Sequence, residues 1–586
     1  MPIEGSGRGN EGDHAGTDAR QGVVPVGSLH RRAAVFGGGP GGLTAAHELA
    51  ERGFEVTLYE RHAELGGKCR SFTVPDTGRA GRADLPGEVG PHAVLGAYQN
   101  LGQTLRRIPV GEGRSVLDRL VPGRTLQLVW AGAKTTVPIS WNALRGSRID
   151  VASLAAEVLG GIRIARRLGV RDTAQFASKC IALLTSGRLR QWEQLEDMSV
   201  EEYYRVDRFG SGGRQWMPVY LQGAPAAADR VSARALVIGS AANVVLGPMV
   251  HRFGPGFDAL AYLTDAPMNE ALFDPWATHL RSLGVRIHTR HRLTEVACEN
   301  GRISGATVRD PDGRDRTVDA DWYVLAVPAD KAAQLMTPQL TACDPALARI
   351  AHIDHTWLGC MQIYLKHPAP ELKSVTFLCG QPWTIACVTP TDGLWQGRFA
   401  DRYGDGTVTS LLSVDVASWD IPGIVYGKPA RRCRGPELFE EIRAQIRAEF
   451  DDPTLLPDTD IHSWTLNPAL SFTDSGEIVH DEPGFNTAPG GWRNRPNAIT
   501  AIDNLFLAAS YVRTSTGVDS MDGANEAGKL AANAILAATR SNQHPAPIET
   551  PIPTPLLARL WAYDDRRYRR GQPNVFDLIA PSRRHY

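Results

Sequence analysis

A cluster of glycines near the N-terminus has the residue types and the spacing needed to hold a pyrophosphate. Gly37, Gly39 and Gly42 satisfy the pattern G-x-G-x-x-G, with Pro40 and Gly41 between them. Gly37 permits a tight turn, Gly39 lets the backbone approach a phosphate, and Gly42 lets a following helix pack closely on its strand. The N-terminus of that helix then faces the anion. The pattern predicts a dinucleotide-binding turn.

The elements on either side of these glycines must position them. Residues 33–36 form a short apolar run typical of a buried parallel strand, and the helix expected over residues 43–52 carries one apolar stripe. A second strand is expected over residues 54–59. It ends at Glu60, about 20 residues beyond the glycines, where an adenosine ribose needs an acceptor for its hydroxyls. The neighbouring Arg61 is a further candidate for cofactor binding.

The glycine pattern does not by itself separate NAD from FAD, so the following segment decides. Residues 64–71 contain a second glycine pair, Gly66 and Gly67, followed by Lys68 and Arg70. This arrangement resembles the signature of flavin amine oxidases and carotenoid desaturases, in which the segment returns to the pyrophosphate and the flavin ribityl chain. The resemblance implies FAD, and a cation at Lys68 or Arg70 facing two phosphates is chemically sensible. A surface turn with solvated charges is the alternative.

A middle segment is expected to join the same nucleotide-binding unit. Residues 284–309 read as strand, strand, tight turn and strand, which is consistent with an antiparallel meander. Residues 320–328 form an apolar strand that ends in Ala-Val-Pro. The resemblance implies that backbone near Leu293 to Val296 contacts the adenine.

The C-terminal part supplies a third piece. Residues 504–511 read as a strand, and after a loop a helix is expected with Ser520 as its N-cap. The positive end of this helix could stabilise negative charge on a reduced flavin. Its small residues permit close approach to a cofactor, or else simply tight helix packing. The cofactor-binding candidates in this piece are Ser510, Ser520, Met521 and Asp522.

Together these residues resemble the FAD-dependent phytoene desaturase and flavin amine oxidase superfamily. The branch with phytoene desaturases, hydroxysqualene dehydroxylases and aromatic carotenoid ring synthases matches more closely, because residues 90–101 look like its G-x-H-x-x-x-G-A-Y-x-N segment, which passes the flavin ring. One departure concerns the family's Ala-Gly-Asp before the C-terminal loop, where this chain has Ala508, Ala509 and Ser510. Ser510 can form a hydrogen bond but carries no charge, so we expect FAD to bind with this one contact weakened.

The expected chemistry is hydride transfer to flavin N5 from a carbon of the substrate, with a second proton to be managed by the protein. The candidates for this role are His92, Tyr98, Tyr511 and Arg513. His92 titrates in the useful range, so it could act as an acid or a base. A histidine that bonds to backbone beside the flavin and takes no part in catalysis is the alternative.

The function expected is therefore that of an FAD-dependent dehydrogenase, or desaturase, of a hydrophobic polyene, isoprenoid or polyketide-like substrate. A flavin amine oxidase is one alternative, for which Lys331 is the only candidate we can name for a lysine–water contact to the flavin. An aromatising or isomerising flavoenzyme of secondary metabolism is another. A flavin-binding protein without turnover is the third, with Ser510 as its only hint.

The composition of the chain limits which partners and which cellular compartment we expect. The 586 residues carry a formal charge of -1, which predicts no net attraction to nucleic acid or anionic membranes. Eight scattered cysteines without metal-ligand spacing argue against a zinc site and a secreted disulfide framework and fit a reducing cytosol. No apolar run is long enough for a membrane span. Residues 154–171 are apolar and basic, which is compatible with contact at a membrane surface and also with an amphipathic helix packed on the protein.

The expected fold class is α/β, with a discontinuous Rossmann-like FAD-binding domain and an inserted α+β substrate-binding domain. The expected boundaries are a disordered leader at 1–31, an FAD-binding domain at 32–109, 282–328 and 497–545, a substrate-binding domain at 110–281 and 329–496, and a C-terminal tail at 546–586, whose basic run 566–570 reads as a solvated helix end.

Overall fold

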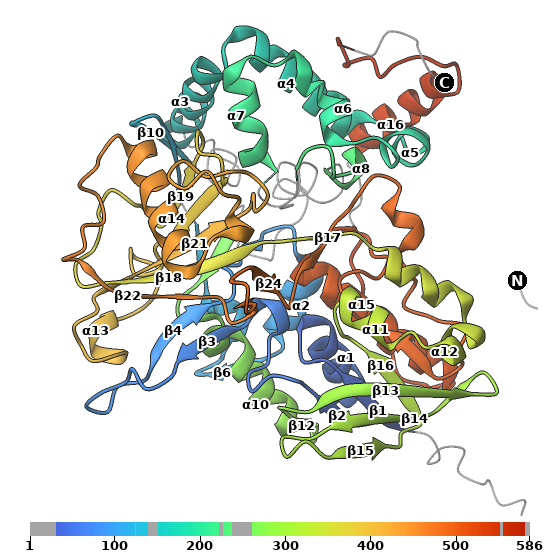
Figure 1. Cartoon of the computed structure of the whole chain (residues 1–586). Coiled ribbons are helices and arrows are strands. Elements are labelled where there is room, and N and C mark those ends of the chain that lie inside the picture. The colour runs from blue at the N-terminus through green and yellow to red at the C-terminus, as the bar shows by residue number, and fades with distance from the viewer. Residues whose placement is uncertain are drawn as a thin grey trace, which may run out of the picture.

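The structure of this protein is a computed structural model (Figure 1), and it describes residues 31–123, 125–138, 151–221, 227–236, 261–550 and 555–579. The predicted leader lies outside the described residues except for Arg31. In Figure 1 the nucleotide-binding sheet lies at the bottom, a second sheet lies at the left, and a layer of helices lies across the top.

A five-stranded parallel sheet gathers strands from three distant parts of the chain. Its order is β12, β2, β1, β16, β26, and every neighbouring pair is parallel. The strands are β12 (Arg286–His288), β2 (Glu55–Tyr59), β1 (Arg32–Phe36), β16 (Trp322–Leu325) and β26 (Leu505–Leu507). The order folds the segments near residues 32, 286, 322 and 505 into one doubly wound unit, and this confirms the predicted Rossmann-like fold class.

Alternation along β1 decides which elements cover the sheet. Ala33 and Val35 face a core shared with α1 (Pro40–Ala50) and α15 (Met521–Ala538), while Ala34 and Phe36 face the opposite core. Successive side chains of a strand point to opposite faces, and both faces of a parallel sheet are normally covered. Burial of a side chain such as Val35 or Phe36 contributes about 1.5–3 kcal/mol.

The strand expected over residues 284–289 is β12 of the parallel sheet and no part of a meander, which corrects the prediction for residues 284–309. The second face is covered by an antiparallel meander that begins one strand later. It consists of β13 (Arg292–Glu299), β14 (Arg302–Arg309) and β15 (Asp315–Val318), with Asn300 and Gly301 at positive φ in the first turn. A disulfide joins Cys298 of β13 to Cys343 at the end of α12 (Pro338–Cys343). The cysteine spacing gave no sign of this bond, because the two residues meet only through the tertiary fold.

The inserted unit is built on a seven-stranded mixed sheet, as the predicted α+β class requires. The order is β10 (Ala133–Pro138), β9 (Thr125–Trp130), β19 (Val375–Leu378), β20 (Ile385–Val388), β21 (Ser410–Val416), β18 (Gly359–Leu365) and β22 (Ile461–Leu466). Only the pair β9–β19 is parallel. Helix α14 (Gly435–Phe450) packs on one face through Leu438, Ile442 and Ile446. The other face lies toward the cavity described below.

A layer of helices covers the inserted unit on the side away from the nucleotide-binding sheet (Figure 1). It includes α3 (Val151–Leu168), α4 (Val170–Thr185), α5 (Arg188–Arg190) and α7 (Ser211–Tyr220). The C-terminal α16 (Pro555–Tyr568) docks on it, since Asp564 is 2% exposed and accepts a hydrogen bond from Arg190 Nε at 2.8 Å. Helix α16 is thus packed on the insert, and Arg566, Arg569 and Arg570 at and just beyond its basic end are exposed. No described helix is long and apolar enough to cross a membrane.

One helix from the range expected in the insert packs elsewhere. Helix α10 (Asp274–Ser282) lies against α1, and its Trp276 and Leu280 belong to the core under the nucleotide-binding sheet. A short helix after a long insert carries no sequence signal for the unit on which it packs.

Candidate functional site

A large cavity begins at the glycine turn and extends between the two sheets to the helical layer. Its volume is about 1480 Å³. A site for one small ligand usually has about 300–1,000 Å³, so the cavity has room for more than one occupant. Its first end is polar and lined by the loops at the carboxyl ends of β1, β2 and β26, which is where open α/β sheets bind nucleotides. Its other end is lined mostly by apolar and aromatic side chains of the insert.

The glycines of the first turn divide into two groups. Gly37, Gly39 and Gly41 line the cavity together with Pro40, whereas Gly42 does not. A Cβ on Gly42 would lie 1.9 Å from the Gly37 oxygen, and a Cβ on Gly41 would lie 1.9 Å from the Ala508 oxygen. At Gly39 the nearest atom is 3.6 Å away, so its absent side chain leaves open cavity. Gly39 is also the N-cap of α1, whose first N–H groups point out of the helix. The turn therefore fits a pyrophosphate.

Glu60 lies where the sequence expects a ribose acceptor. It is 5% exposed and lines the cavity. Its Oε2 accepts a hydrogen bond from the Gly38 N–H at 2.6 Å, and its Oε1 accepts one from the His62 N–H at 2.8 Å. Each carboxylate oxygen accepts more than one bond, so Glu60 can shape the turn and still accept ribose hydroxyls.

The second glycine pair packs on the first turn. Gly66 and Gly67 both have positive φ, and a Cβ on Gly67 would lie 3.0 Å from the Gly39 Cα. Lys68 lines the cavity and its Nζ lies 3.2 Å from Oδ2 of Asp519. Arg70 does not face the cavity. It is 2% exposed and donates to Glu482 and to the Gly67 carbonyl oxygen, which corrects the expectation that it faces phosphates.

Glu482 pairs with the positively charged side chains at this end of the cavity. It is 6% exposed and lines the cavity, and its carboxylate bonds to Arg61, His62 and Arg70. Burial alone would raise the pKa of Glu482, but its hydrogen bond to His62 and the charge of Arg70 outweigh burial and hold that pKa well below its usual range. The sequence gave no hint of this residue, since it lies 421, 420 and 412 residues beyond Arg61, His62 and Arg70.

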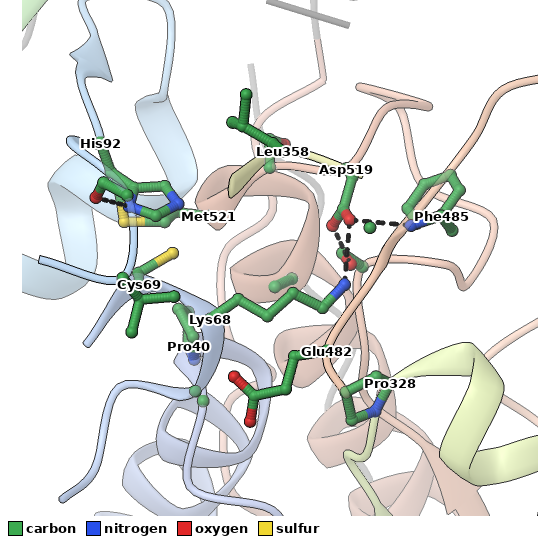
Figure 2. Close-up of a pocket in the computed structure, with 18 of the residues that line it drawn as sticks. Pro40, Lys68, Cys69, His92, Pro328, Leu358, Glu482, Phe485, Asp519 and Met521 are labelled. Atoms are coloured by element: carbon green, nitrogen blue, oxygen red, sulfur yellow. Dashed lines mark hydrogen bonds and ion pairs between the residues drawn. The ribbon is translucent and has the colours of Figure 1, made fainter. Parts of the chain in front are cut away.

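Asp519 supplies a carboxylate beside Ser510. It is bonded to the Ser510 hydroxyl and to the Phe485 N–H, and Figure 2 shows Lys68 extending toward it across the cavity. Burial alone would raise the pKa of Asp519, but the Lys68 charge and the Ser510 hydrogen bond lower it. Both Ser510 and Asp519 line the cavity.

The helix predicted after this loop is α15, and Ser520 is its N-cap through a hydrogen bond from the Gly523 N–H. Ser520 and Met521 line the cavity, but Asp522 does not. Asp522 accepts a hydrogen bond from the Leu101 N–H, and burial raises its pKa to about 7, so it fixes the helix α2 (Gln99–Arg106) to α15. This departs from the expectation that Asp522 binds the cofactor.

The loop before α15 is held by a buried arginine. Arg495 is 5% exposed and donates to the carbonyl oxygens of Ser510, Tyr511, Val512 and Gly517. Burial and the nearby Arg234 lower its pKa to about 9. A guanidinium has five donors in a fixed fork, which suits it to bind several carbonyls of one loop.

At the nucleotide end the meander contributes one of its two candidates. Leu293 lines the cavity, whereas Val296 is 3% exposed and packs under the sheet in the second core. The side chain of Val296 therefore supports the meander, and only its backbone remains a candidate for contact with adenine.

The proton-handling candidates separate in the same way. His92 and Tyr98 line the cavity, and Tyr511 and Arg513 do not. Tyr511 is 1% exposed, and its hydroxyl has no partner in the described part of the chain. Arg513 donates to the carbonyl oxygens of Trp492 and Arg493, so the positions of these two residues do not support the expectation that they handle protons. The Nδ1 of His92 lies 2.5 Å from the Gly90 carbonyl oxygen. Because a carbonyl only accepts, neutral His92 carries its proton on Nδ1 and leaves Nε2 as an acceptor.

Asp415 is a further cavity residue that the sequence analysis missed, besides Glu482 and Asp519. Asp415, on β21, is 7% exposed and lines the cavity, and its Oδ1 has no hydrogen-bond partner among the described residues. Burial raises its pKa to about 8. The available signal was a single carboxylate inside a strand, Ser410–Val416, whose other residues are apolar or serine.

Two further groups lie away from the substrate end. Lys331 lines the cavity but pairs with Asp330 and Asp481, at 3.1 and 2.7 Å, beside the nucleotide end. This is the wrong end for a lysine that contacts the flavin ring. His47, Glu51 and His279 gather at the C-terminal end of α1 with ligand-type atoms within 4.8 Å, but Arg107 already pairs with Glu51. The sequence had predicted no metal site, and His279 reaches this group only through the packing of α10.

Comparison with known proteins places this geometry in a family. The profile of the flavin containing amine oxidoreductases matches residues 40–536. The carotenoid phi-ring synthase of Chlorobaculum tepidum is 37% identical over an alignment of 603 residues. The match covers 88% of this chain and 90% of that protein. The zeta-carotene desaturase of Synechocystis sp. is 23% identical over 536 residues, which cover 86% and 97%.

Among solved structures, a putrescine oxidase bound to putrescine superposes with a TM-score of 0.55 at 16% sequence identity, covering 87% of this chain and 99% of that one. This likeness shows the fold alone. The glycine turn, the buried Glu60 carboxylate beside it and the family match together identify the cofactor as FAD. The chain belongs to the flavin-containing amine oxidoreductase family and is an FAD-dependent oxidoreductase.

Proposed function

We propose that the protein dehydrogenates a long hydrophobic polyene of the carotenoid class. The observation that carries this proposal is the apolar arm of the cavity, which continues past the flavin-binding end. The arm is lined by Leu126, Phe176, Ile181, Trp216, Val219, Tyr220 and Phe377. Rigid aromatic and aliphatic walls bind an extended hydrocarbon through burial of its surface, and they offer few partners to a charged amine.

FAD would be held by the side chains and turns at the first end of the cavity. The α1 turn at Gly39 and the Lys68 ammonium suit the pyrophosphate, Glu60 suits the ribose, and the N-terminus of α15 at Ser520 suits the flavin ring. When bound, FAD supplies a hydride acceptor. The protein must therefore orient the substrate, exclude water and accept a proton.

His92 is suited to accept that proton. It lines the cavity in the segment that the family places next to the flavin, and its Nε2 is free to accept. Desolvation in the cavity lowers the pKa of His92, so it is neutral at pH 7 and ready to act as a base.

An aromatising function is the second candidate. The relative with 37% identity is a carotenoid phi-ring synthase, and the more distant relatives include zeta-carotene desaturases. Aromatisation of a ring and desaturation both remove hydrogen from the substrate, so the same cavity serves either.

The cavity reaches the surface beside an apolar and basic helix. Ala177 and Ile181 of α4 line the cavity and are exposed. On the adjacent α3, Val158, Leu159 and Ile162 are 52%, 50% and 43% exposed, and Arg163 and Arg166 lie on the same helix. We infer that this surface rests on a membrane from which a lipid-soluble substrate enters.

The function is tested by anaerobic mixing of the yellow holoprotein with a carotenoid polyene or with amines. We expect the polyene to bleach the flavin and putrescine to leave it oxidised. A protein that cannot be reconstituted with FAD, or one bleached only by amines, would overturn the proposal. For the membrane surface, Leu159→Glu should reduce flotation with anionic phosphatidylglycerol vesicles, while Ile499→Glu, which changes another exposed apolar residue, should not. Flotation unchanged by Leu159→Glu would overturn that part.

A further inference from the structure

The cavity contains a carboxyl group that the hydride chemistry does not require. Asp415 is more than nine-tenths buried, and its unpartnered Oδ1 lies among cavity-lining residues. The carboxyl group bonds to the Cys360 side chain and has no charged partner among the described residues. Burial of a carboxylate in such surroundings is costly, so the group keeps its proton and is a neutral acid. This is the arrangement of a proton donor that faces an apolar ligand.

The position of Asp415 in the sheet is fixed on both sides. Strand β21 lies between β18 and β20, where Cys360 and Ala386 are the cross-strand partners of Asp415. Ala386 also lines the cavity. A central strand with partners on both edges cannot slip without moving its whole hydrophobic set. The carboxyl group is thus held against the cavity by the sheet itself.

The titratable groups around Asp415 leave it without a counter-ion among the described residues. Burial raises the pKa of the Cys360 and Cys387 thiols, and it raises that of Glu88 to about 8, so these three are neutral at pH 7. The pKa of His92 is lowered by desolvation, so this imidazole is neutral too. None of these groups therefore supplies a fixed positive charge that would stabilise the ionised form of Asp415.

Asp415 and His92 approach the same glycine. A Cβ placed on Gly90 would lie 3.3 Å from the His92 Cε1 and 3.9 Å from the Asp415 Oδ1. The two side chains are thus neighbours at the cavity wall, one with a proton to give and one with a free acceptor nitrogen. Two groups whose environments push their pKa values in opposite directions are the usual form of an acid–base pair.

We propose that Asp415 donates a proton to a carbon–carbon double bond of the substrate, so that the cavity catalyses double-bond migration or skeletal rearrangement as well as dehydrogenation. The π pair of the double bond forms the new C–H bond, and the pair of the broken O–H bond stays on the carboxylate. The remaining cation is delocalised along the polyene. A neighbouring carbon then returns a proton to the Asp415 carboxylate or to Nε2 of His92, and a double bond forms again. No electrons are exchanged and no co-reactant is needed.

This inference rests on the proposed function for the nature of the substrate, and deuterium incorporation separates the two. The holoprotein is incubated in D₂O with β-carotene and the product is examined by mass spectrometry and NMR. We expect deuterium at a carbon of the product. Asp415→Asn, which keeps the shape without the acid, should lower incorporation by on the order of 100-fold and retain flavin. Ser413→Ala, on the same strand but outside the cavity lining, should not lower it.

Dehydrogenated product without deuterium overturns the acid role and leaves the proposed function in place, whereas a lack of any product overturns both. Infrared spectroscopy gives a readout besides turnover. The carbonyl band of protonated carboxylic acids should be present at pH 6 and should fade with a midpoint near pH 8, with contributions from both Asp415 and Glu88. The band should lose the Asp415 contribution in Asp415→Asn and keep it in Ser413→Ala. A band unaffected by Asp415→Asn contradicts the proposal.

Discussion

The Ser510 hydroxyl donates a hydrogen bond of 2.5 Å to Oδ1 of Asp519, and Oδ2 of the same carboxylate accepts from Lys68. Ser510 stands where the family places an aspartate, and Asp519 supplies a negative charge at the same point from nine residues further along. This substitution in space weakens the case for a flavin-binding protein without turnover, for which Ser510 was the hint.

Removal of the Asp519 charge should therefore weaken FAD binding more than removal of the Ser510 hydroxyl. We expect Asp519→Asn to raise the Kd for FAD about tenfold, since it breaks a charge-assisted bond to Lys68 and about 1.4 kcal/mol corresponds to tenfold. Ser510→Ala should raise it less. Titration of the apoprotein by flavin fluorescence measures both, with the exposed Asp503→Asn as control. Equal losses in Asp519→Asn and Asp503→Asn would contradict this role.

Two glycines of the same turn should fail in different ways. Gly39 has φ -78° and an open cavity where its side chain would lie, so Gly39→Ala should fold normally and lose FAD. Gly41→Ala places a Cβ 1.9 Å from the Ala508 oxygen, which forces the backbone to move and costs about 1–3 kcal/mol or more. Thermal unfolding of the apoproteins separates the two, with only Gly41→Ala showing a lowered Tm. Equal Tm values would mean that both glycines serve the cofactor alone.

The sequence predicted the nucleotide-binding half of this site because its signals are local. A few consecutive residues are enough to predict the glycine turn, Glu60 and the cap at Ser520. The periodicity of the neighbouring strands then locates these features in the fold. Glu482, Asp519 and Asp415 gave no such signal. The role of each residue depends on partners hundreds of residues away or on burial against the second sheet. Neither long-range partners nor burial can be deduced from a single short segment.

The misassigned residues have the same physical origin. Arg70, Tyr511 and Asp522 lie next to cavity-lining residues in sequence, and proximity along the chain suggested a shared role. Side chains of consecutive residues point in different directions, so Arg70 turns toward Glu482 and Asp522 turns toward α2. Direction of this kind depends on the packed neighbours, which the sequence does not show.

Acid should destabilise the protein through Glu482. Its folded-state pKa lies below the unfolded value of about 4.5, so its stabilisation is complete above that pH and is lost as the pH falls below it. Glu482→Gln leaves Arg61 and Arg70 without their buried partner and should cost about 3–5 kcal/mol at pH 7, with a smaller further loss toward pH 3.5 than the unchanged protein shows. Chemical unfolding across this range tests the prediction. Asp481→Asn, which removes a more exposed carboxylate from Arg61, should cost less.

The apolar arm should be blocked where it reaches the surface. Ala177 lines the cavity on α4, and a tryptophan there would fill the opening between Ile181 and Phe176 without touching the glycine turn. We expect Ala177→Trp to keep its FAD and its Tm but to slow flavin reduction by a long polyene at least tenfold. Ala174→Trp lies on the same helix, is exposed and does not line the cavity, so it should behave as the unchanged protein. Because a short soluble substrate analogue needs less of the arm, its rate should fall less in Ala177→Trp. Equal slowing of long and short substrates would show that they enter by another route.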